Sequence, residues 1–182
     1  NRSSTKSALG TAPNGGWRPW LMAELEKQGV YACALSMPTP EHPVCSEWIE
    51  EISRHVKKNR EDEVYLIGHS LGVPAILRYL ETKPEKLISG AILVSGPLKK
   101  TGHKEIDNFL EKFNFEIIKS QCPAFYILHG DDDPLVPLDN AEFLSRELNG
   151  ELIIIPNGKH LNGSAGWFSF PKLLEAFNAM IR

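Results

Sequence analysis

The sequence has few cysteines, little net charge and no long apolar run. Its three cysteines, Cys33, Cys45 and Cys122, are scattered and form no C-x-x-C pair, which argues against a disulfide framework or structural zinc and favours a reducing, cytoplasmic environment. No run approaches membrane-spanning length, and no signal-peptide pattern opens the chain. The net charge of -3 comes without a Lys/Arg stripe, so we expect neither nucleic acid nor a membrane as partner.

What the sequence does contain is a regular alternation of apolar runs and amphipathic segments. The 182 residues show no linker or repeat, so we expect a single domain over 1–182. Strands are predicted at Val30 to Leu35, Val64 to Ile67, Ala91 to Val94, Ala124 to Leu128 and Leu152 to Ile155. Helices are predicted at Trp17 to Gln28, Ser46 to Lys58, Val73 to Glu81, Ala141 to Leu148 and Leu173 to Ile181. This order predicts an α/β fold with a mainly parallel sheet covered by helices on both faces.

The most informative motif is Gly68-His69-Ser70-Leu71-Gly72, which lies between a predicted strand and a predicted helix. A nucleophilic serine has to stand clear of the backbone on a tight turn, and glycines at both flanks allow that turn. The motif therefore predicts a nucleophile elbow with Ser70 as nucleophile. The alternative is that Ser70 is only a small residue at a strand-to-helix turn.

Two loops after later strands carry an acid and a base. Asp131, Asp132 and Asp133 follow the strand ending at Leu128, and His160 follows the last predicted strand. The carboxyl ends of parallel strands share one edge of a sheet, so these loops should lie near the elbow, and the order Ser, Asp, His is that of α/β-hydrolases. A calcium loop at the aspartates and a surface role for the histidine are the alternatives, although the alternating spacing of an EF-hand is absent.

Taken together, the motifs resemble one family. Besides the elbow, the acid loop and Gly158-Lys159-His160, they include Trp17-Arg18-Pro19-Trp20-Leu21, Ser36-Met37-Pro38 and Leu93-Val94-Ser95-Gly96. From about Gly10 to the C-terminus the chain resembles the small serine hydrolases related to retinoblastoma-binding protein nine.

The resemblance implies an α/β-hydrolase fold with a minimal lid and assigns the site residues. Ser70 would be the nucleophile and His160 the general base, and the pattern H-G-x-x-D-x-x-V-P selects Asp133 as the acid. The backbone N–H of Leu71 would bind the oxyanion, with a second donor near Leu9 and Gly10. No metal or organic cofactor is expected.

Two segments need separate predictions. Family members begin with an apolar strand ending in His-Gly, whereas residues 1–9 show no alternation and little apolar content. We therefore predict that these residues form no well-packed central strand and that the oxyanion loop near Leu9 and Gly10 is displaced or mobile. Residues 97–122 exceed an ordinary connection and predict a short flap. Its Phe109, Phe113 and Phe115, with Trp17, would help line an acyl pocket; the alternative is that these phenylalanines only pack.

The sequence thus predicts a serine hydrolase resembling carboxylesterases, acting on a small-molecule acyl ester through an acyl-enzyme, with amides or thioesters as further possibilities. Two alternatives stay open: a non-catalytic binding protein on the same fold, and an acyltransferase. No L-x-C-x-E motif is present, so a retinoblastoma-type interaction is not expected. The oligomeric state is left open.

Overall fold

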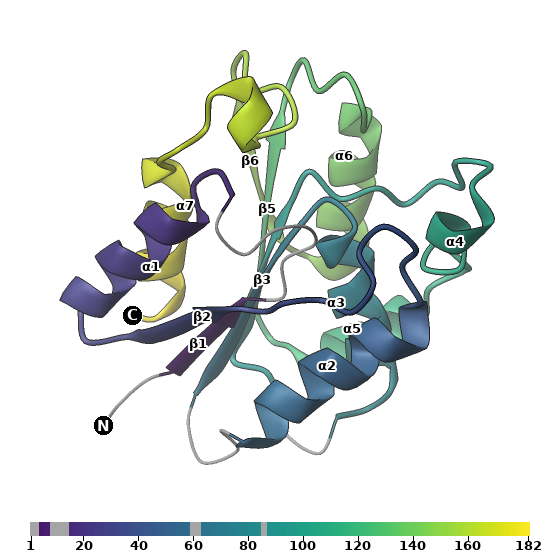
Figure 1. The fold of residues 1–182 in the computed structure, drawn as a ribbon, viewed down its shortest axis with the longest axis horizontal. Coiled ribbons are helices and arrows are strands. Elements are labelled where there is room, and N and C mark those ends of the chain that lie inside the picture. Colours follow the sequence, from purple (N-terminus) through teal and green to yellow (C-terminus); the bar gives the residue numbers. More distant parts are fainter. Residues whose placement is uncertain (1–3, 8–14, 59–62, 85–86) are drawn as a thin grey trace.

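The computed structural model describes residues 4–7, 15–58, 63–84 and 87–182. Within these ranges six parallel strands form one sheet in the order β2-β1-β3-β4-β5-β6 (Figure 1). The strands are β1 (Ser4–Ser7), β2 (Tyr31–Ala34), β3 (Val64–His69), β4 (Gly90–Val94), β5 (Phe125–Gly130) and β6 (Glu151–Ile155). All five strands predicted from the sequence are therefore present, together with one that was not predicted.

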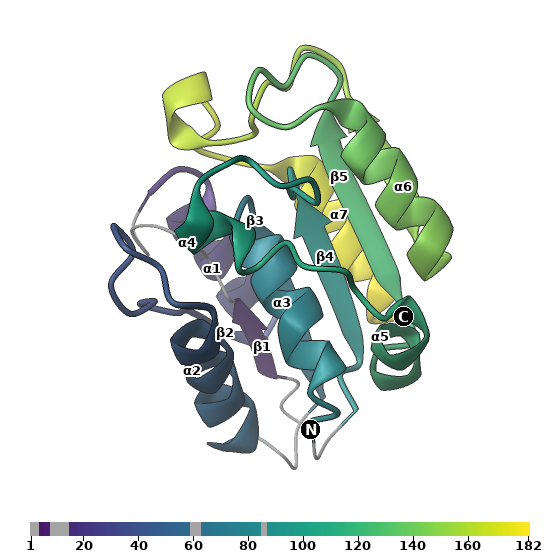
Figure 2. The same cartoon turned by 90° about the vertical axis from the view of Figure 1, so that its right-hand side faces the viewer.

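Helices cover both faces of this sheet. They are α1 (Arg18–Lys27), α2 (Cys45–Lys58), α3 (Gly72–Glu81), α4 (Lys104–Asp107), α5 (Phe115–Gln121), α6 (Leu138–Leu148) and α7 (Pro171–Met180), with a 3-10 turn η1 (Gly163–Ala165). Helices α1 and α7 lie on one face, and α2, α3 and α6 lie on the other (Figures 1 and 2). Among the described residues, no helix has the length and apolar character needed to cross a membrane.

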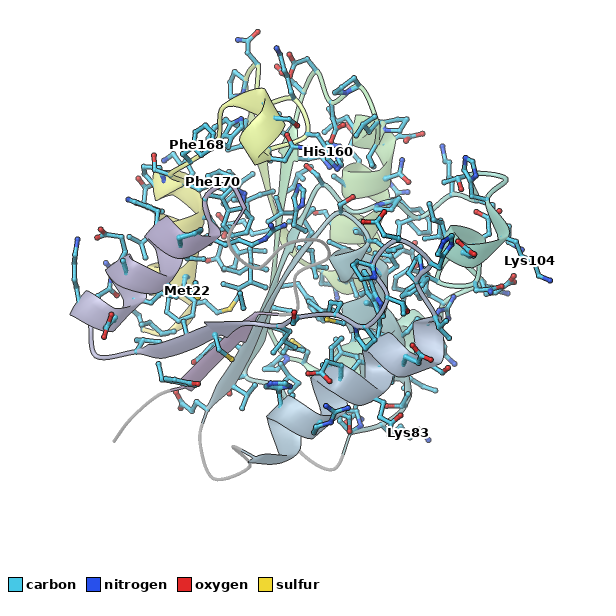
Figure 3. The ribbon with its side chains drawn as sticks, in the orientation of Figure 1. Met22, Lys83, Lys104, His160, Phe168 and Phe170 are labelled. Atoms are coloured by element: carbon cyan, nitrogen blue, oxygen red, sulfur yellow. The ribbon has the colours of Figure 1, made fainter. Side chains whose placement is uncertain are left out.

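The alternation of side chains along each strand divides the interior into two cores. On β3, Tyr65 and Ile67 pack toward α1 and α7, whereas Val64 and Leu66 pack toward α2 and α3. Figure 3 shows Phe170 within the core on the α1 and α7 side. Because both faces of β3 are buried, the strand is apolar along most of its length, as the sequence pattern indicated.

The N-terminal segment corrects a prediction. The prediction was that residues 1–9 form no well-packed central strand, but Ser4–Ser7 forms β1, which pairs in parallel with β2 on one side and β3 on the other, so a central strand is present. The packing of its side chains lies outside what the structure describes. The physical reason is that a ladder uses backbone N–H and C=O groups, which serine, threonine and lysine supply as well as valine does. The missing apolar alternation concerns the side chains alone and does not prevent the backbone of this segment from pairing.

Candidate active site

Ser70 lies at a sharp turn between β3 and α3. Its φ is +52°, in the left-handed region that non-glycine residues seldom adopt. A Cβ added to Gly68 would stand 2.8 Å from the carbonyl oxygen of Gly72, so the strand and the helix can approach this closely only because position 68 is a glycine. The Ser70 N–H donates to the carbonyl of Val94 on β4 at 2.9 Å, which ties the turn to the sheet.

A chain of hydrogen bonds joins Ser70, His160 and Asp133. His160 Nε2 is 3.1 Å from Ser70 Oγ, and His160 Nδ1 is 2.9 and 3.1 Å from the two carboxylate oxygens of Asp133. Because a carboxylate can only accept, Nδ1 carries the proton and Nε2 is left to accept the Ser70 hydroxyl proton. The structure therefore brings the three residues together as the sequence predicted.

The Asp133 carboxylate is buried yet ionised. Its side chain is 0% exposed. Burial by itself raises the pKa of Asp133, but N–H groups of Leu135 and Val136 at 2.9 and 3.0 Å, together with His160, outweigh that effect and lower it. A fixed negative charge behind the imidazole stabilises the ring when it gains a proton.

Each of the three aspartates holds a different position of the loop that carries His160. Asp131 Oδ1 accepts the backbone N–H of Asn157 at 2.8 Å, and Asp132 Oδ1 accepts that of Lys159 at 2.7 Å. Asp133 is the one whose carboxylate contacts the imidazole. The aspartate run thus binds one loop at three points.

Side chains from elsewhere hold the rest of this loop by its carbonyls. Trp167 Nε1–H donates to Gly158, His69 Nε2–H donates to His160, and Trp17 Nε1–H donates to Leu161, each at 2.8 Å. Together with the two aspartate contacts, every residue from 157 to 161 has a backbone group bound by a distant side chain.

These bonds accompany a strained backbone. Asn157, Lys159 and Leu161 all have φ near +50°, and such residues typically cost about 1–3 kcal/mol each. His69 is buried, and burial lowers its pKa to about 3, so the ring is a neutral donor. The sequence analysis assigns His69 no function, and its place beside Ser70 was the available signal.

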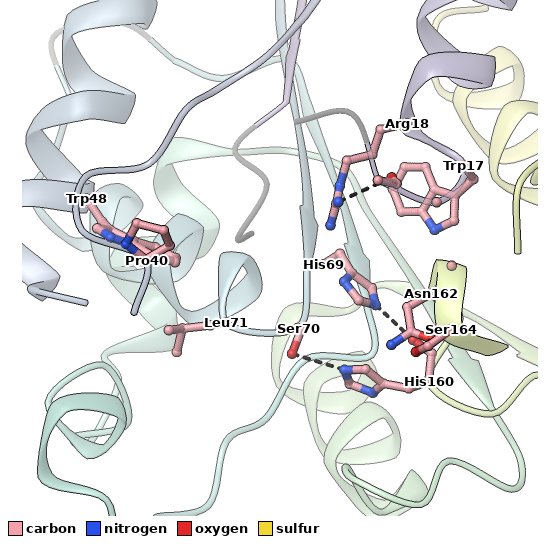
Figure 4. Close-up of a pocket in the computed structure, with 13 residues that line it drawn as sticks. Trp17, Arg18, Pro40, Trp48, His69, Ser70, Leu71, His160, Asn162 and Ser164 are labelled. Carbon is pink, nitrogen blue, oxygen red and sulfur yellow. Dashed lines mark hydrogen bonds between the residues drawn. The ribbon is translucent and has the colours of Figure 1, made fainter. Parts of the chain in front are cut away.

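Ser70 and His160 face a pocket of about 340 Å³ (Figure 4). Its apolar walls are Trp17, Pro40, Trp48 and Leu71, and its polar lining includes Arg18, Asn162 and Ser164. Trp17 therefore lines the pocket that contains Ser70, as the sequence analysis predicted.

The three phenylalanines of the predicted flap do not line this pocket. Phe109 is buried behind Trp48, with ring centroids 5.3 Å apart, and Phe113 and Phe115 line a separate groove. Arg78 of α3 explains the placement, because it donates to the Phe109 carbonyl at 3.0 Å and lies 3.9 Å from the Phe113 ring centre. The alternative, that these residues only pack, describes Phe109 best. Leu9 and Gly10 lie outside the described residues, so the second oxyanion donor stays a prediction.

A parallel sheet that presents a serine on a left-handed turn, with histidine and aspartate loops at the same edge, defines the α/β-hydrolase fold. A sequence model of the serine hydrolase family matches residues 9–179, and the chain belongs to that family.

Individual relatives agree with this assignment. The YdeN protein of Bacillus subtilis is 32% identical over 166 residues, which cover 90% of this chain and 87% of that protein. Serine hydrolase RBBP9 of Rattus norvegicus is 25% identical over 176 residues, covering 94% and 90%. The crystal structure of the Bacillus subtilis ydeN gene product has a TM-score of 0.91 at 28% identity and covers 98% of each chain. The predicted family resemblance and fold are confirmed.

Proposed function

We propose that this serine hydrolase is a carboxylesterase that cleaves small acyl esters through a covalent intermediate on Ser70. The observation that carries the proposal is the continuous hydrogen-bond chain from Ser70 Oγ through the His160 ring to Asp133, opening on a pocket. A serine hydroxyl becomes an effective nucleophile when an adjacent base removes its proton and a third group orients that base.

The geometry supports a two-stage reaction. Ser70 Oγ attacks the ester carbonyl while its proton passes to His160 Nε2; the tetrahedral intermediate then expels the alkoxide, which takes that proton and leaves as alcohol. A water molecule next gives its proton to Nε2 and attacks the acyl-enzyme, and Ser70 departs with the returned proton as the acid is released. Asp133 stabilises the imidazolium at each stage.

The negative charge on the former carbonyl oxygen needs hydrogen-bond donors. The Leu71 N–H lies at the N-terminus of α3, where the first backbone N–H groups have no partner within the helix and the helix dipole is positive. We assign it as one oxyanion donor; loss of one such donor typically costs about a hundred- to a thousand-fold in kcat. The volume of the pocket and its apolar walls favour a short acyl group.

Labelling with a fluorophosphonate probe, alongside hydrolysis of p-nitrophenyl butyrate, tests the proposal. Wild type should be labelled at Ser70 and hydrolyse the ester, and Ser70→Ala should do neither. His160→Ala should lose about as much activity as Ser70→Ala, because triad members act as a unit. Ser120→Ala, which removes a serine hydroxyl from α5 outside the pocket lining, should retain both properties.

The other outcomes are equally informative. Absence of labelling would identify a non-catalytic binding protein, and labelling with product formed only when an alcohol acceptor is added would identify an acyltransferase. Wild-type turnover by Ser70→Ala would overturn the assignment of the nucleophile.

A further inference from the structure

The loop that carries Asp133 is short and exposed at its tip. Residues 131–137 connect β5 to α6 (Figure 2). Leu135 is 68% exposed, so packing of its side chain does not fix the loop. Asp133 itself binds the turn, because its Oδ1 accepts the N–H groups of Leu135 and Val136 at 2.9 and 3.0 Å. The orientation of the carboxylate therefore depends on where the backbone of Leu135 and Val136 lies.

A buried histidine near the end of β5 binds this backbone. His129 is 0% exposed, and its Nε2 lies 2.8 Å from the carbonyl oxygen of Val136. Because a carbonyl can only accept, Nε2 carries the proton and donates. A proton on Nδ1 would find no acceptor, since that nitrogen has no hydrogen-bond partner within the described ranges. The tautomer protonated on Nε2 alone therefore fits the site.

The same ring nitrogen also lies close to the carboxylate. His129 Nε2 is 3.6 Å from Asp133 Oδ2, which is too far for a direct hydrogen bond. Both side chains are 0% exposed, so little water screens the N–H group from the negative charge. Asp133 Oδ2 is in addition 2.9 Å from His160 Nδ1. Two imidazole rings thus approach one carboxylate oxygen.

The arrangement at Asp133 repeats the one at His160. His69, the last residue of β3, donates through Nε2 to the His160 carbonyl at 2.8 Å. His129 donates through Nε2 to the Val136 carbonyl at the same distance. One buried strand histidine therefore holds the loop of the proposed base, and a second one holds the loop of the proposed acid.

We propose that His129 is a positioning residue for the acid. Its bond to the Val136 carbonyl keeps the N–H groups of the turn directed at Asp133 Oδ1. The carboxylate is thereby held in the orientation in which it accepts the His160 Nδ1–H. The inference rests on the proposed function, because it concerns the acid that would orient His160 during the reaction.

Three substitutions test the proposal. His129→Leu has no donor, His129→Asn has an amide too short to reach the Val136 carbonyl, and His129→Gln places an amide N–H near the position of Nε2. In hydrolysis of p-nitrophenyl butyrate, His129→Leu and His129→Asn should lose about tenfold or more in kcat. Their KM should stay close to that of wild type, because the acid does not contact the substrate. His129→Gln should retain most of kcat.

A second buried residue of β5 provides the matched control. Ile127 is 1% exposed and precedes His129 by two residues on the same strand. Ile127→Val removes a buried methylene and lowers stability without touching the loop bonds described above. Urea unfolding of each variant gives the folded fraction by which kcat is corrected. After that correction Ile127→Val should have the kcat and KM of wild type.

Nuclear magnetic resonance of ¹⁵N-histidine-labelled protein adds a readout that overall stability does not move. The N–H between His160 and Asp133 forms a charge-assisted hydrogen bond and should give a proton resonance far downfield, which His160→Ala removes. This resonance should move upfield or broaden in His129→Leu and return in His129→Gln. In wild type the ¹⁵N shifts of His129 should show a proton on Nε2 and none on Nδ1.

Three results would each overturn the inference: wild-type kcat and resonance in His129→Leu, an equal loss in His129→Gln and His129→Leu, or a wild-type spectrum that places the His129 proton on Nδ1. If His129→Leu does not fold, His129→Asn and the wild-type spectrum still test the donor. In all these cases labelling of Ser70 by the fluorophosphonate probe leaves the proposed function intact. Failure of the probe to label wild type would instead remove the proposed function itself.

Discussion

The Ser70 elbow and the His160 loop present the two side chains that would react in the proposed mechanism, yet they are built in different ways. The elbow is a local structure: Gly68 allows the backbone to approach Gly72, and the turn continues directly into α3. The loop from 157 to 161 is held from outside, by Trp17 of the segment before α1, His69 of β3, two aspartates after β5, and Trp167. Ser70 is positioned mainly by its neighbours in sequence, with one backbone hydrogen bond to β4, whereas His160 is positioned mainly by residues far from it in sequence.

The amount of backbone strain follows the same division. The elbow has one left-handed residue, Ser70, whereas the His160 loop has Asn157, Lys159 and Leu161. A strained conformation persists only when its surroundings stabilise it. The loop with more strained residues is also the one bound by five distant side chains, so removing those contacts should affect it more than it affects the elbow.

Exchange of the acid should have the largest effect. In Asp133→Asn an amide group would face His160 Nδ1 and favour the wrong tautomer, so we expect a loss of kcat on the order of 10⁴-fold. Asp132→Asn keeps an oxygen for the Lys159 N–H and should be mild, as should Asp131→Asn. Steady-state kinetics on one ester compare the three, and a greater loss in either control would show that the acid has been misassigned.

A methyl group added to the elbow should act on stability. Gly68→Ala places a Cβ 2.8 Å from the Gly72 carbonyl, and we expect a loss of about 1–3 kcal/mol in the free energy of unfolding. Gly29→Ala is the control, because Gly29 has a φ of +74° but nothing within 4 Å of the added atom. Urea unfolding should show a smaller loss of unfolding free energy for Gly29→Ala than for Gly68→Ala. The reverse order would mean that the close approach of residues 68 and 72 does not require glycine at position 68.

The last effect concerns His69 and appears only when the pH is lowered. Its pKa is about 3 in the folded protein against 6.5 as the ordinary value, so between these values the unfolded chain binds a proton that the folded one does not. Stability should therefore fall as the pH drops from 6.5 toward 3, by about 1.4 kcal/mol per pH unit from this residue. His69→Asn removes that contribution while retaining a donor for the His160 carbonyl. The unfolding free energies of wild type and His69→Asn, measured from pH 7 to 4.5, should therefore diverge as the pH falls. Parallel curves would contradict the lowered pKa of His69.

The sequence predicted what local pattern determines. Buried strands such as β3 are apolar along most of their length, and the elbow is specified within five residues, so both could be found without coordinates. Sequence reasoning failed where backbone pairing or contacts between distant residues determine the structure. Strand β1 pairs through its main chain, which the side-chain pattern does not show. Phe113 has the same apolar character whether it lines a pocket or packs against Arg78. Apart from the place of His69 beside Ser70, the donors that hold the His160 loop are marked by no local sequence pattern.

The bond from His69 to the His160 carbonyl has a consequence for the second half of the proposed reaction. Once Ser70 Oγ is esterified it has no proton to donate, and its hydrogen bond to His160 ends. The bond from His69 does not involve that hydroxyl and persists. The residue next to the esterified serine thus still holds the backbone of the base, which keeps the imidazole above the acyl group while water arrives. His160 therefore keeps its position in the proposed acyl-enzyme, because the hydrogen bond from His69 does not involve Ser70 Oγ.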